Sequence, residues 1–225
     1  MPVLPRDLAP MKRHILWLIC SAFLAAVLPL TAQTIKVACI GDSITQGFTV
    51  VNPAVNAYPI VLGRLLGPAY QTVNFGVGGT TLLRNGDSPY WNQSALGQAT
   101  NYAPDIVTIM LGTNDSKPQN WIYKDQFAGD LSDMIDLFAN LPSHPKVFVC
   151  IPVPAYAVNY AINPDIIKNQ IIPIIKAVAK QKGITTIDLY TPMCGRPELF
   201  ADNIHPNAAG DAIIARVLQG ALIAH

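Results

Sequence analysis

Five short apolar runs rich in β-forming residues recur along the chain, and segments of helical periodicity separate them. The runs are Lys36–Ile40, Thr72–Phe75, Ile106–Leu111, Lys146–Ile151 and Thr185–Leu189. Near-continuous apolar strands that alternate with helices are typical of a parallel sheet covered on both faces. We therefore predict a single α/β domain with three layers, α/β/α, in which the five runs form a parallel sheet.

Helices are predicted between and after these runs, over Ala57–Leu66, Ser94–Ala99, Trp121–Leu141 and Asn163–Lys182 and from beyond Pro206 to about Leu222. The fourth of them has clear end signals. Asn163 is placed to cap its first turn, and Pro164 suits the first helical position. Gly183 is expected to end this helix, and Pro173 to kink it.

Residues 1–32 have the pattern of an N-terminal extension followed by a secretory signal peptide. Basic residues at positions 12–14 precede an apolar run, Ile15–Leu28, and small residues follow at positions 31 and 32. The run is short for a transmembrane helix, although an uncleaved membrane anchor is the alternative. We expect cleavage after Ala32, a secreted or periplasmic protein without stable membrane insertion, and one domain over residues 33–225.

The composition of the chain argues against several classes of partner. Charged residues make up 13% of the chain, the formal net charge is +1, and no basic run occurs beyond the N-terminal segment. A nucleic-acid footprint is therefore not expected. Cys39 and Cys150 fall inside predicted strands and are expected to be buried free thiols. With Cys194 they show no spacing typical of a metal site.

Unusual polar and glycine residues follow the predicted strands at one end of the sheet. They include Asp42 and Ser43 after the first strand, Gly76–Thr80 after the second and Gly112–Asp115 after the third. Asp202–His205 lies in the loop after the fifth strand, whereas the opposite end has plain connectors such as residues 141–145. Ligands of open α/β sheets bind at the carboxyl edge of the strands. We predict the functional site at this edge.

Ser43 is the candidate nucleophile at this edge, because it follows a strand and a glycine turn and precedes a helix. A serine nucleophile needs a base, and histidine is the usual one. The chain has four histidines. His14 belongs to the predicted signal, His225 is terminal, and His144 lies at the opposite edge. His205 remains as the candidate base.

Asp202 precedes His205 by three residues, close enough to accept the Nδ1–H of the ring and fix its tautomer. Considered alone, the two residues could also form a turn and a helix cap. They could also be two metal ligands, but no further cluster of His or Cys completes such a site. We therefore expect no metal and no cofactor. Paired-carboxylate glycosidase chemistry is a further alternative, although Glu198 is the sole glutamate.

Donors for an oxyanion are available near Ser43. The amide of Ser43 begins a helix, the Gly78–Gly79 backbone can approach closely, and Asn114 can add a side-chain NH₂. The alternative for Asn114 is an Asx turn with Asp115. A dinucleotide loop is disfavoured for the glycine cluster, because Thr81 occupies the last glycine position of that motif.

Four ordered blocks of this chain resemble those of the GDSL/SGNH hydrolase family: Gly41–Ser43, Gly79 in its segment, Gly112–Asp115 and Asp202–His205. The third block reads Gly-Thr-Asn-Asp, where some members have Gly-Gly-Asn-Asp. The resemblance implies a flavodoxin-like strand order. It implies Ser43 as nucleophile, His205 as general base and Asp202 as the residue that orients the base. The oxyanion hole would consist of the Ser43 and Gly79 amides and the Asn114 side chain.

The substrate is inferred from aromatic and amide residues near these blocks. Trp91, Asn92 and Trp121 are candidate substrate-binding residues, because indoles stack on sugar rings and an amide reaches hydroxyls. The alternative for Trp121 is core packing. Tyr156 and Tyr160 could close another wall of the site.

These segments are similar to those of secreted bacterial family members grouped with sialate O-acetylesterases and acetylxylan esterases. We therefore predict a serine esterase that removes O-acetyl groups from sialate-type or xylan-type glycans, its partner being the acetylated glycan or a small acetyl ester. A lipolytic esterase, similar to lysophospholipases or thioesterases, is an alternative within the family. A non-catalytic glycan-binding module is an alternative from another class.

Overall fold

Five parallel strands form the central sheet of the computed structural model, which describes residues 33–224. They are β1 (Ile35–Gly41), β2 (Tyr70–Gly76), β3 (Ile106–Met110), β4 (Lys146–Ile151) and β5 (Thr185–Asp188). Their order is β2-β1-β3-β4-β5, and every neighbouring pair is parallel. This is the flavodoxin-like order, in which the chain changes direction across the sheet between β1 and β3. The predicted sheet and its order are confirmed.

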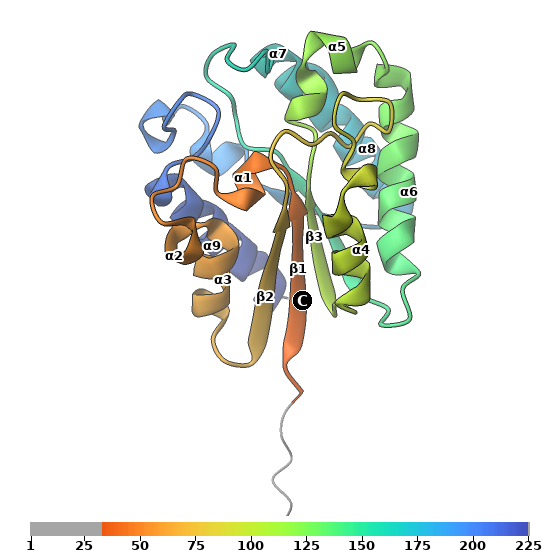
Figure 1. Cartoon of the computed structure of the whole chain (residues 1–225), viewed down its shortest axis with the longest axis vertical. Coiled ribbons are helices and arrows are strands. Elements are labelled where there is room, and N and C mark those ends of the chain that lie inside the picture. The colour runs from red at the N-terminus through yellow and green to blue at the C-terminus, as the bar shows by residue number, and fades with distance from the viewer. Residues whose placement is uncertain (1–32, 225) are drawn as a thin grey trace, which may run out of the picture. The chain divides into compact units, whose positions relative to one another are not determined.

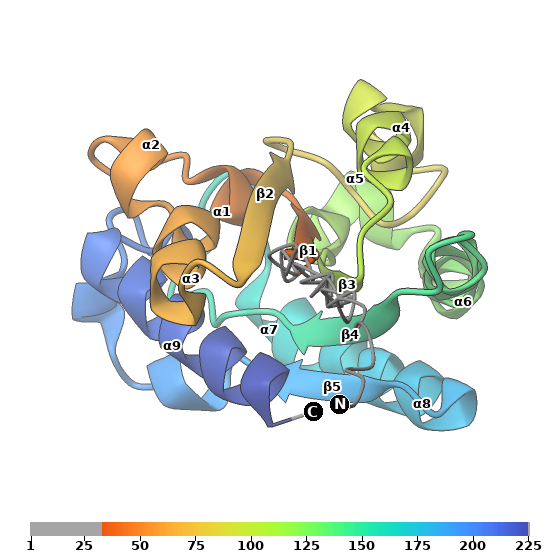
Figure 2. The ribbon, with the colours of Figure 1, turned by 90° about the horizontal axis from the view of Figure 1, so that it is seen from below.

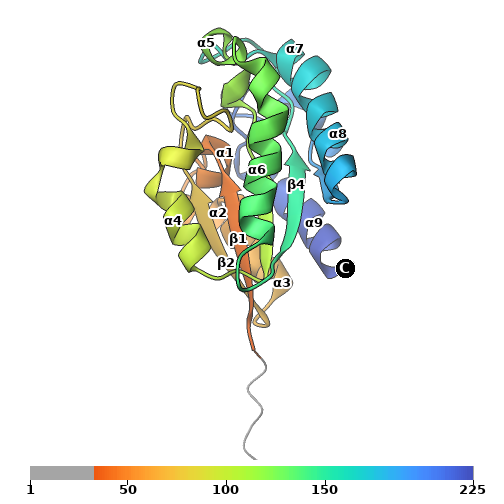
Figure 3. The same ribbon diagram turned by 90° about the vertical axis from the view of Figure 1, so that its right-hand side faces the viewer.

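Helices cover both faces of this sheet and complete the three predicted layers (Figures 1 and 2). The long helices are α3 (Tyr58–Leu66), α4 (Ser94–Asn101), α6 (Phe127–Ala139), α8 (Ile172–Lys182) and α9 (Ala208–Ile223). Helices α4, α6 and α8 share one layer, which faces the viewer in Figure 3, and α3 and α9 form the other. Side chains of β1 alternate between the layers: Ala38 and Ile40 pack under the first, Val37 and Cys39 under the second.

Shorter elements connect these parts. The short α-helices are α1 (Ser43–Gln46), α2 (Pro53–Asn56), α5 (Pro118–Trp121) and α7 (Pro164–Ile166). Single 3₁₀ turns cover Tyr90–Asn92, Asn114–Ser116, Lys124–Gln126, Thr191–Met193 and Pro197–Leu199.

The helix predicted over Trp121–Leu141 is wrong at its start. Trp121 ends α5, and α6 begins at Phe127. In one continuous α-helix, the six-residue step from Trp121 to Phe127 would rotate the side chain through about 600°. The two side chains would then point about 120° apart. Both rings are buried, and they contact each other with centroids 5.6 Å apart. The break between the helices allows this contact.

The helix predicted over Asn163–Lys182 is present but interrupted. The Asn163 side chain caps it by accepting the N–H groups of Asp165 and Ile166, and Gly183 ends it with a φ of 66°. A π-helical turn (Ile167–Ile171) separates α7 from α8, where Pro173 is the second residue. Proline lacks the N–H of a regular helical turn and clashes with the carbonyl four residues earlier, which accounts for an irregular turn here.

The predicted signal peptide and extension, residues 1–32, lie outside the described residues, as does His225. Within residues 33–224 no helix combines the length and the apolar character needed to cross a bilayer. Cys39 and Cys150 are buried free thiols, as predicted, and Cys194 is exposed.

Candidate active site

Ser43 stands at the carboxyl edge of the sheet because β1 ends at Gly41 and α1 begins with the serine. A Cβ atom on Gly41 would lie 2.0 Å from Thr45 Oγ1 and 2.8 Å from the Met110 carbonyl oxygen, so the turn requires glycine. Asp42 caps α1, and its Oδ1 accepts the Ile44 N–H at 2.9 Å. The serine hydroxyl is thus fixed beside the point where the strand order reverses.

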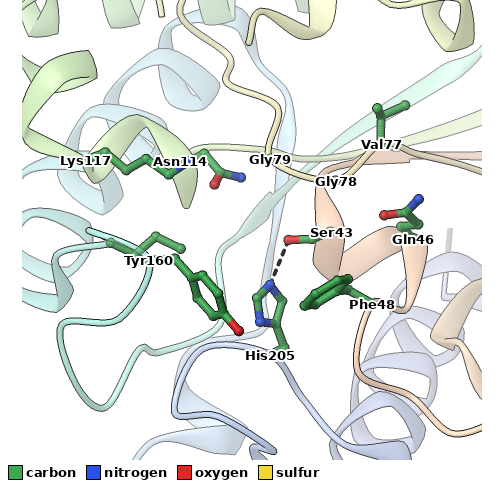
Figure 4. Close-up of a pocket in the computed structure, with 11 residues that line it drawn as sticks. Ser43, Gln46, Phe48, Val77, Gly78, Gly79, Asn114, Lys117, Tyr160 and His205 are labelled. Carbon is green, nitrogen blue, oxygen red and sulfur yellow. Dashed lines mark hydrogen bonds between the residues drawn. The ribbon is translucent and has the colours of Figure 1, made fainter. Parts of the chain in front are cut away.

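A hydrogen-bonded chain links Ser43 to two residues of the loop before α9. Ser43 Oγ lies 2.9 Å from His205 Nε2, as the dashed line in Figure 4 shows. His205 Nδ1 lies 2.8 Å from Asp202 Oδ2. The Asp202 Oδ1 atom accepts the backbone N–H groups of Ile204 and His205 at 3.0 and 2.8 Å. The structure therefore brings together the three residues predicted as nucleophile, base and orienting acid.

The carboxylate of Asp202 is stabilised in its ionised form. Burial raises its pKa, but the hydrogen bonds donated by the His205 backbone and ring and by the Ile204 N–H outweigh burial, and the net pKa is below its usual value. An ionised Asp202 accepts the Nδ1–H of His205 and leaves Nε2 free to accept a proton from Ser43. This geometry suits a serine nucleophile.

Asp42, although adjacent to Ser43, has a different environment. Its side chain is 1% exposed, and burial raises its pKa to about 6, while the hydrogen bond from the Ile44 N–H lowers it in part. Its contacts are those of a helix cap. The prediction that Asp202 and not Asp42 pairs with His205 agrees with this geometry.

Gly79 and Asn114 lie on the other side of Ser43, in the loops after β2 and β3 (Figure 4). Gly79 has a φ of 78°, a conformation that favours glycine. Asn114 Nδ2 donates a hydrogen bond to the Thr80 carbonyl at 3.1 Å. The amide carries two hydrogens, so a second one remains for a ligand in the cavity. The Asn114 side chain therefore bonds to the neighbouring loop and does not form the Asx turn with Asp115 that was the alternative.

Asp115 holds the loop that carries Gly79 against the turn after β3. Its two carboxylate oxygens accept the N–H groups of Leu82 and Leu83 at 3.0 and 2.7 Å, and burial raises its pKa to about 7. Asn120 Nδ2 donates to the Asn114 carbonyl at 2.9 Å. Sequence reasoning did not assign these supporting roles. The sequence signal for the role of Asp115 was the Asn-Asp pair itself: Asn114 faces the cavity, and Asp115 faces the adjacent loop.

A cavity of about 470 Å³ opens above Ser43. It is lined by Ser43, Gln46, Phe48, Val77, Gly78, Gly79, Asn114, Lys117, Tyr160, Ile162 and His205. The rings of Phe48 and Tyr160 flank the His205 ring at centroid distances of 5.0 and 5.5 Å. Tyr160 was expected as a wall residue and does line the cavity. Tyr156 does not, because its hydroxyl donates to the Met193 carbonyl.

Gln46, Phe48, Lys117 and Ile162 were not predicted as site residues. Gln46 and Phe48 follow Ser43 within five positions, so the turn after the serine was a local signal for them. Lys117 follows Asn114 by three positions. No local pattern pointed to Ile162.

The three predicted substrate-binding residues do not line this cavity, which corrects the prediction. Trp91 Nε1 donates to the Leu82 carbonyl at 2.8 Å, and the Arg84 guanidinium covers its ring at 3.8 Å. Asn92 is exposed on the 3₁₀ turn that also contains Trp91.

Trp121 is 7% exposed and packs in the core, so the alternative of core packing holds for it. Its Nε1 donates to Gln170 Oε1 at 2.8 Å. The Trp91 and Trp121 indoles are thus engaged by packing and by hydrogen bonds within the fold.

Metal ligands do not gather in the part of the chain that the structure describes: it contains no group of three or more His, Cys, Asp or Glu residues arranged to hold an ion. The polar side chains that face the cavity are instead the serine, histidine, asparagine, glutamine, lysine and tyrosine named above. Such a set offers a nucleophile, a base and hydrogen-bond donors.

Comparison with known proteins places this geometry in a family. Residues 39–213 match the family model described as "GDSL-like Lipase/Acylhydrolase family". An acetylxylan esterase of Xylanibacter ruminicola is 40% identical over 208 residues, which cover 84% of this chain and 43% of the relative. The chain therefore spans less than half the length of this curated relative.

Solved structures share the fold. A carbohydrate acetylesterase from Sinorhizobium meliloti aligns with a TM-score of 0.66 at 19% identity, covering 85% of this chain and 99% of the other. The native aryl esterase of M. smegmatis gives the same four values, a TM-score of 0.66, 19% identity and coverages of 85% and 99%. At this level of identity the likeness establishes the architecture.

Proposed function

Because the chain belongs to the GDSL-like lipase/acylhydrolase family, we propose that it is a serine esterase that removes O-acetyl groups from carbohydrates. The observation that carries the proposal is the hydrogen-bonded chain Ser43–His205–Asp202, with contacts of 2.9 and 2.8 Å, at the floor of a cavity. Nothing in this chemistry calls for a metal or cofactor.

The proposed reaction has two steps. His205 Nε2 takes the Ser43 proton as Oγ attacks the acetyl carbonyl, and the imidazolium then protonates the departing sugar alcohol. Water, deprotonated by His205, attacks the acetyl-enzyme and releases acetate and free Ser43. Asp202 holds the ring in the required tautomer through the Nδ1 contact and stabilises the imidazolium.

The oxyanion of each tetrahedral intermediate is proposed to bind three donors. The Ser43 N–H is at the first position of α1, where no intrahelical acceptor exists. The Gly79 N–H and the second hydrogen of Asn114 Nδ2 supply the other two. All three residues line the cavity, and the hydrogen bond from Asn114 to Thr80 fixes the side chain before substrate binds.

Two observations support a carbohydrate as the alcohol part of the ester. The relative that is 40% identical is an acetylxylan esterase. Donor side chains, Gln46 and Lys117, and an aromatic ring, Tyr160, line the cavity together, and this combination suits the hydroxyls and apolar faces of a sugar.

The test is ester hydrolysis by the wild type and by Ser43→Ala, with Ser94→Ala as a matched control because Ser94 is exposed at the start of α4. With p-nitrophenyl acetate we expect Ser43→Ala to lower kcat by about 10⁴-fold or more. The control should keep wild-type activity. Equal activity of Ser43→Ala and wild type would refute the serine mechanism.

Substrate class is tested by acetate release from acetylated xylan and acetylated sialic acid and by fatty-acid release from a lysophospholipid. We expect the highest kcat/KM for one of the two glycans. A preference for the lysophospholipid would support a lipolytic esterase instead. Binding of glycans without any hydrolysis would support a glycan-binding module.

We also propose that residues 1–32 direct export to the periplasm or the medium, on the sequence pattern described above. Intact-mass analysis of the exported protein should give a chain that begins at Gln33. A mass that retains residues 1–32 would indicate an anchor.

A further inference from the structure

Lys117 gives one wall of the cavity a positive charge, which a long ion pair with Asp87 offsets in part. Among the described residues that line the cavity there is one lysine and no acidic side chain. The Lys117 side chain is 15% exposed, so most of its stem is buried. Its Nζ lies 3.8 Å from Asp87 Oδ2, which is longer than a hydrogen bond.

Asp87 is already engaged by other donors. Gln119 Nε2 donates to Asp87 Oδ2 at 3.0 Å, and Asn120 Nδ2 donates to Asp87 Oδ1 at 3.0 Å. No hydrogen bond from Lys117 Nζ is found within residues 33–224. An ammonium group has three N–H donors, and a ligand in the cavity can accept from them in place of solvent. The donors of Lys117 are therefore accessible to a ligand in the cavity.

Lys117 is placed beyond the proposed oxyanion donors. In Figure 4, Gly78, Gly79, Asn114 and Lys117 follow one another along one side of the cavity, and Tyr160 lies across from Lys117. An acetyl carbonyl held at Gly79 and Asn114 would leave room for the sugar between Lys117 and Tyr160. Tyr160 is 53% exposed as a residue and lines the cavity, so it can offer its ring to a pyranose.

We propose that Lys117 binds a carboxylate carried by the sugar whose acetyl ester is cleaved, so that the enzyme prefers acetylated acidic sugars to neutral ones. This inference rests on the proposed esterase function. Carboxylates occur on pyranose rings in hexuronic acids and in sialic acids, and the chemistry of recognition is shared. An ammonium–carboxylate contact at a partly buried place is a charge-assisted hydrogen bond.

The competing role for Lys117 is stabilisation of the oxyanion. The two roles differ in what they affect. A carboxylate subsite acts on the substrate's own charge, so its loss raises KM more for acidic substrates than for neutral ones. An oxyanion role acts on the acetyl group that all substrates share, so its loss lowers kcat for every substrate.

The experiment compares an O-acetylated methyl glucuronoside with its 6-carboxamide, which keeps the size and removes the charge. O-acetylated sialic acid and its 1-carboxamide form the second pair, and p-nitrophenyl acetate reports the shared chemistry. The variants are Lys117→Gln and Lys117→Arg. Lys124→Gln is the matched control, because Lys124 is exposed and does not line the cavity.

We expect wild type to prefer at least one acid to its carboxamide, and Lys117→Gln to raise KM for that acid by about 10-fold to 100-fold, the range of a hydrogen bond to a charged group. The KM for the carboxamides and for p-nitrophenyl acetate should rise less than that for the acid, so that the preference for the acid is lost. Lys117→Arg should keep the preference in part, and Lys124→Gln in full. The pair that responds identifies the kind of acid.

Three results would overturn the inference: no preference in wild type, no effect of Lys117→Gln, or an equal loss of kcat on all substrates. A binding measurement distinguishes failure of the carboxylate subsite from failure of the proposed esterase function. Calorimetric titration of Ser43→Ala, with and without Lys117→Gln, compares affinity for each acid and its carboxamide without turnover. A loss of preference in the double variant supports the subsite even if wild type hydrolyses nothing, and an unchanged preference refutes it.

Discussion

Replacing Asn114 with alanine removes two N–H hydrogens, one donated within the fold and one that we propose binds the oxyanion. One hydrogen of Nδ2 is donated to the Thr80 carbonyl at 3.1 Å, within the fold. The other is available to the cavity that Asn114 lines. The substitution should therefore produce two separate losses, one in folding stability and one in catalysis, which can be measured independently.

The two losses have different sizes. Loss of one neutral hydrogen bond to Thr80 should lower the free energy of unfolding by about 1 kcal/mol, which for a domain of this size lowers Tm by roughly 2–4 °C. Loss of one oxyanion donor should lower kcat by about 10²–10³-fold, equivalent to about 2.7–4 kcal/mol. KM should change little, because the carbonyl oxygen acquires its charge only in the transition state.

The assay is steady-state hydrolysis of p-nitrophenyl acetate combined with urea unfolding of the same preparations. Asn92→Ala is the control, because Asn92 is an exposed asparagine that does not line the cavity. A fall in kcat of less than about threefold, or a loss expressed in KM alone, would remove Asn114 from the proposed oxyanion hole. A loss of stability much above that of one hydrogen bond would indicate that the Gly79 loop has moved, and the kinetic result would then report that movement.

Two further predictions concern groups outside the reaction. Burial raises the pKa of Asp211 from 3.8 to about 8, and the hydrogen bond from the Tyr58 N–H opposes this in part. Between these two pH values the folded state holds a proton that the unfolded state has released. The free energy of unfolding should therefore fall as pH rises from about 4 to 8. Asp211→Asn should flatten this slope in urea unfolding at pH 5 and 8.5, and an unchanged slope would contradict the assignment. Trp121→Ala should lower the free energy of unfolding by about 3–5 kcal/mol. Both Trp121→Ala and Trp91→Ala should leave KM for acetylated xylan within about twofold of wild type. A KM increase of about tenfold in either variant would indicate that the replaced indole contacts the substrate.

The regular elements were largely predictable because they depend on local periodicity. Each predicted strand overlaps an observed one, and the cap at Asn163 and the stop at Gly183 lie where the sequence placed them. The error at Trp121 concerns a break in the helix that the apolar periodicity did not indicate. A break between α5 and α6 accompanies the contact of the Trp121 and Phe127 rings, which in one continuous helix would point about 120° apart.

The reacting residues were predictable for a different reason. His205 is 162 positions from Ser43, yet the fold class places strand ends at one edge, and the chain offers few histidines to that edge. Asp202 followed from its short spacing to His205. The 2.9 and 2.8 Å contacts of His205 and the lowered pKa of Asp202 could only come from the structure.

The walls of the cavity were decided mainly by tertiary structure. An indole near the active edge has the same local signature whether it stacks on a sugar or packs in the core, because burial depends on elements distant in sequence, as with Trp121 and Gln170. Trp121 packs inward for this reason, while Tyr160 and Lys117 face the cavity. The sequence by itself thus determined the sheet, its functional edge and the residues proposed to react. Only the packing of loops from all five strand ends decided which side chains would meet a substrate, because local patterns encode few of the contacts that build cavity walls.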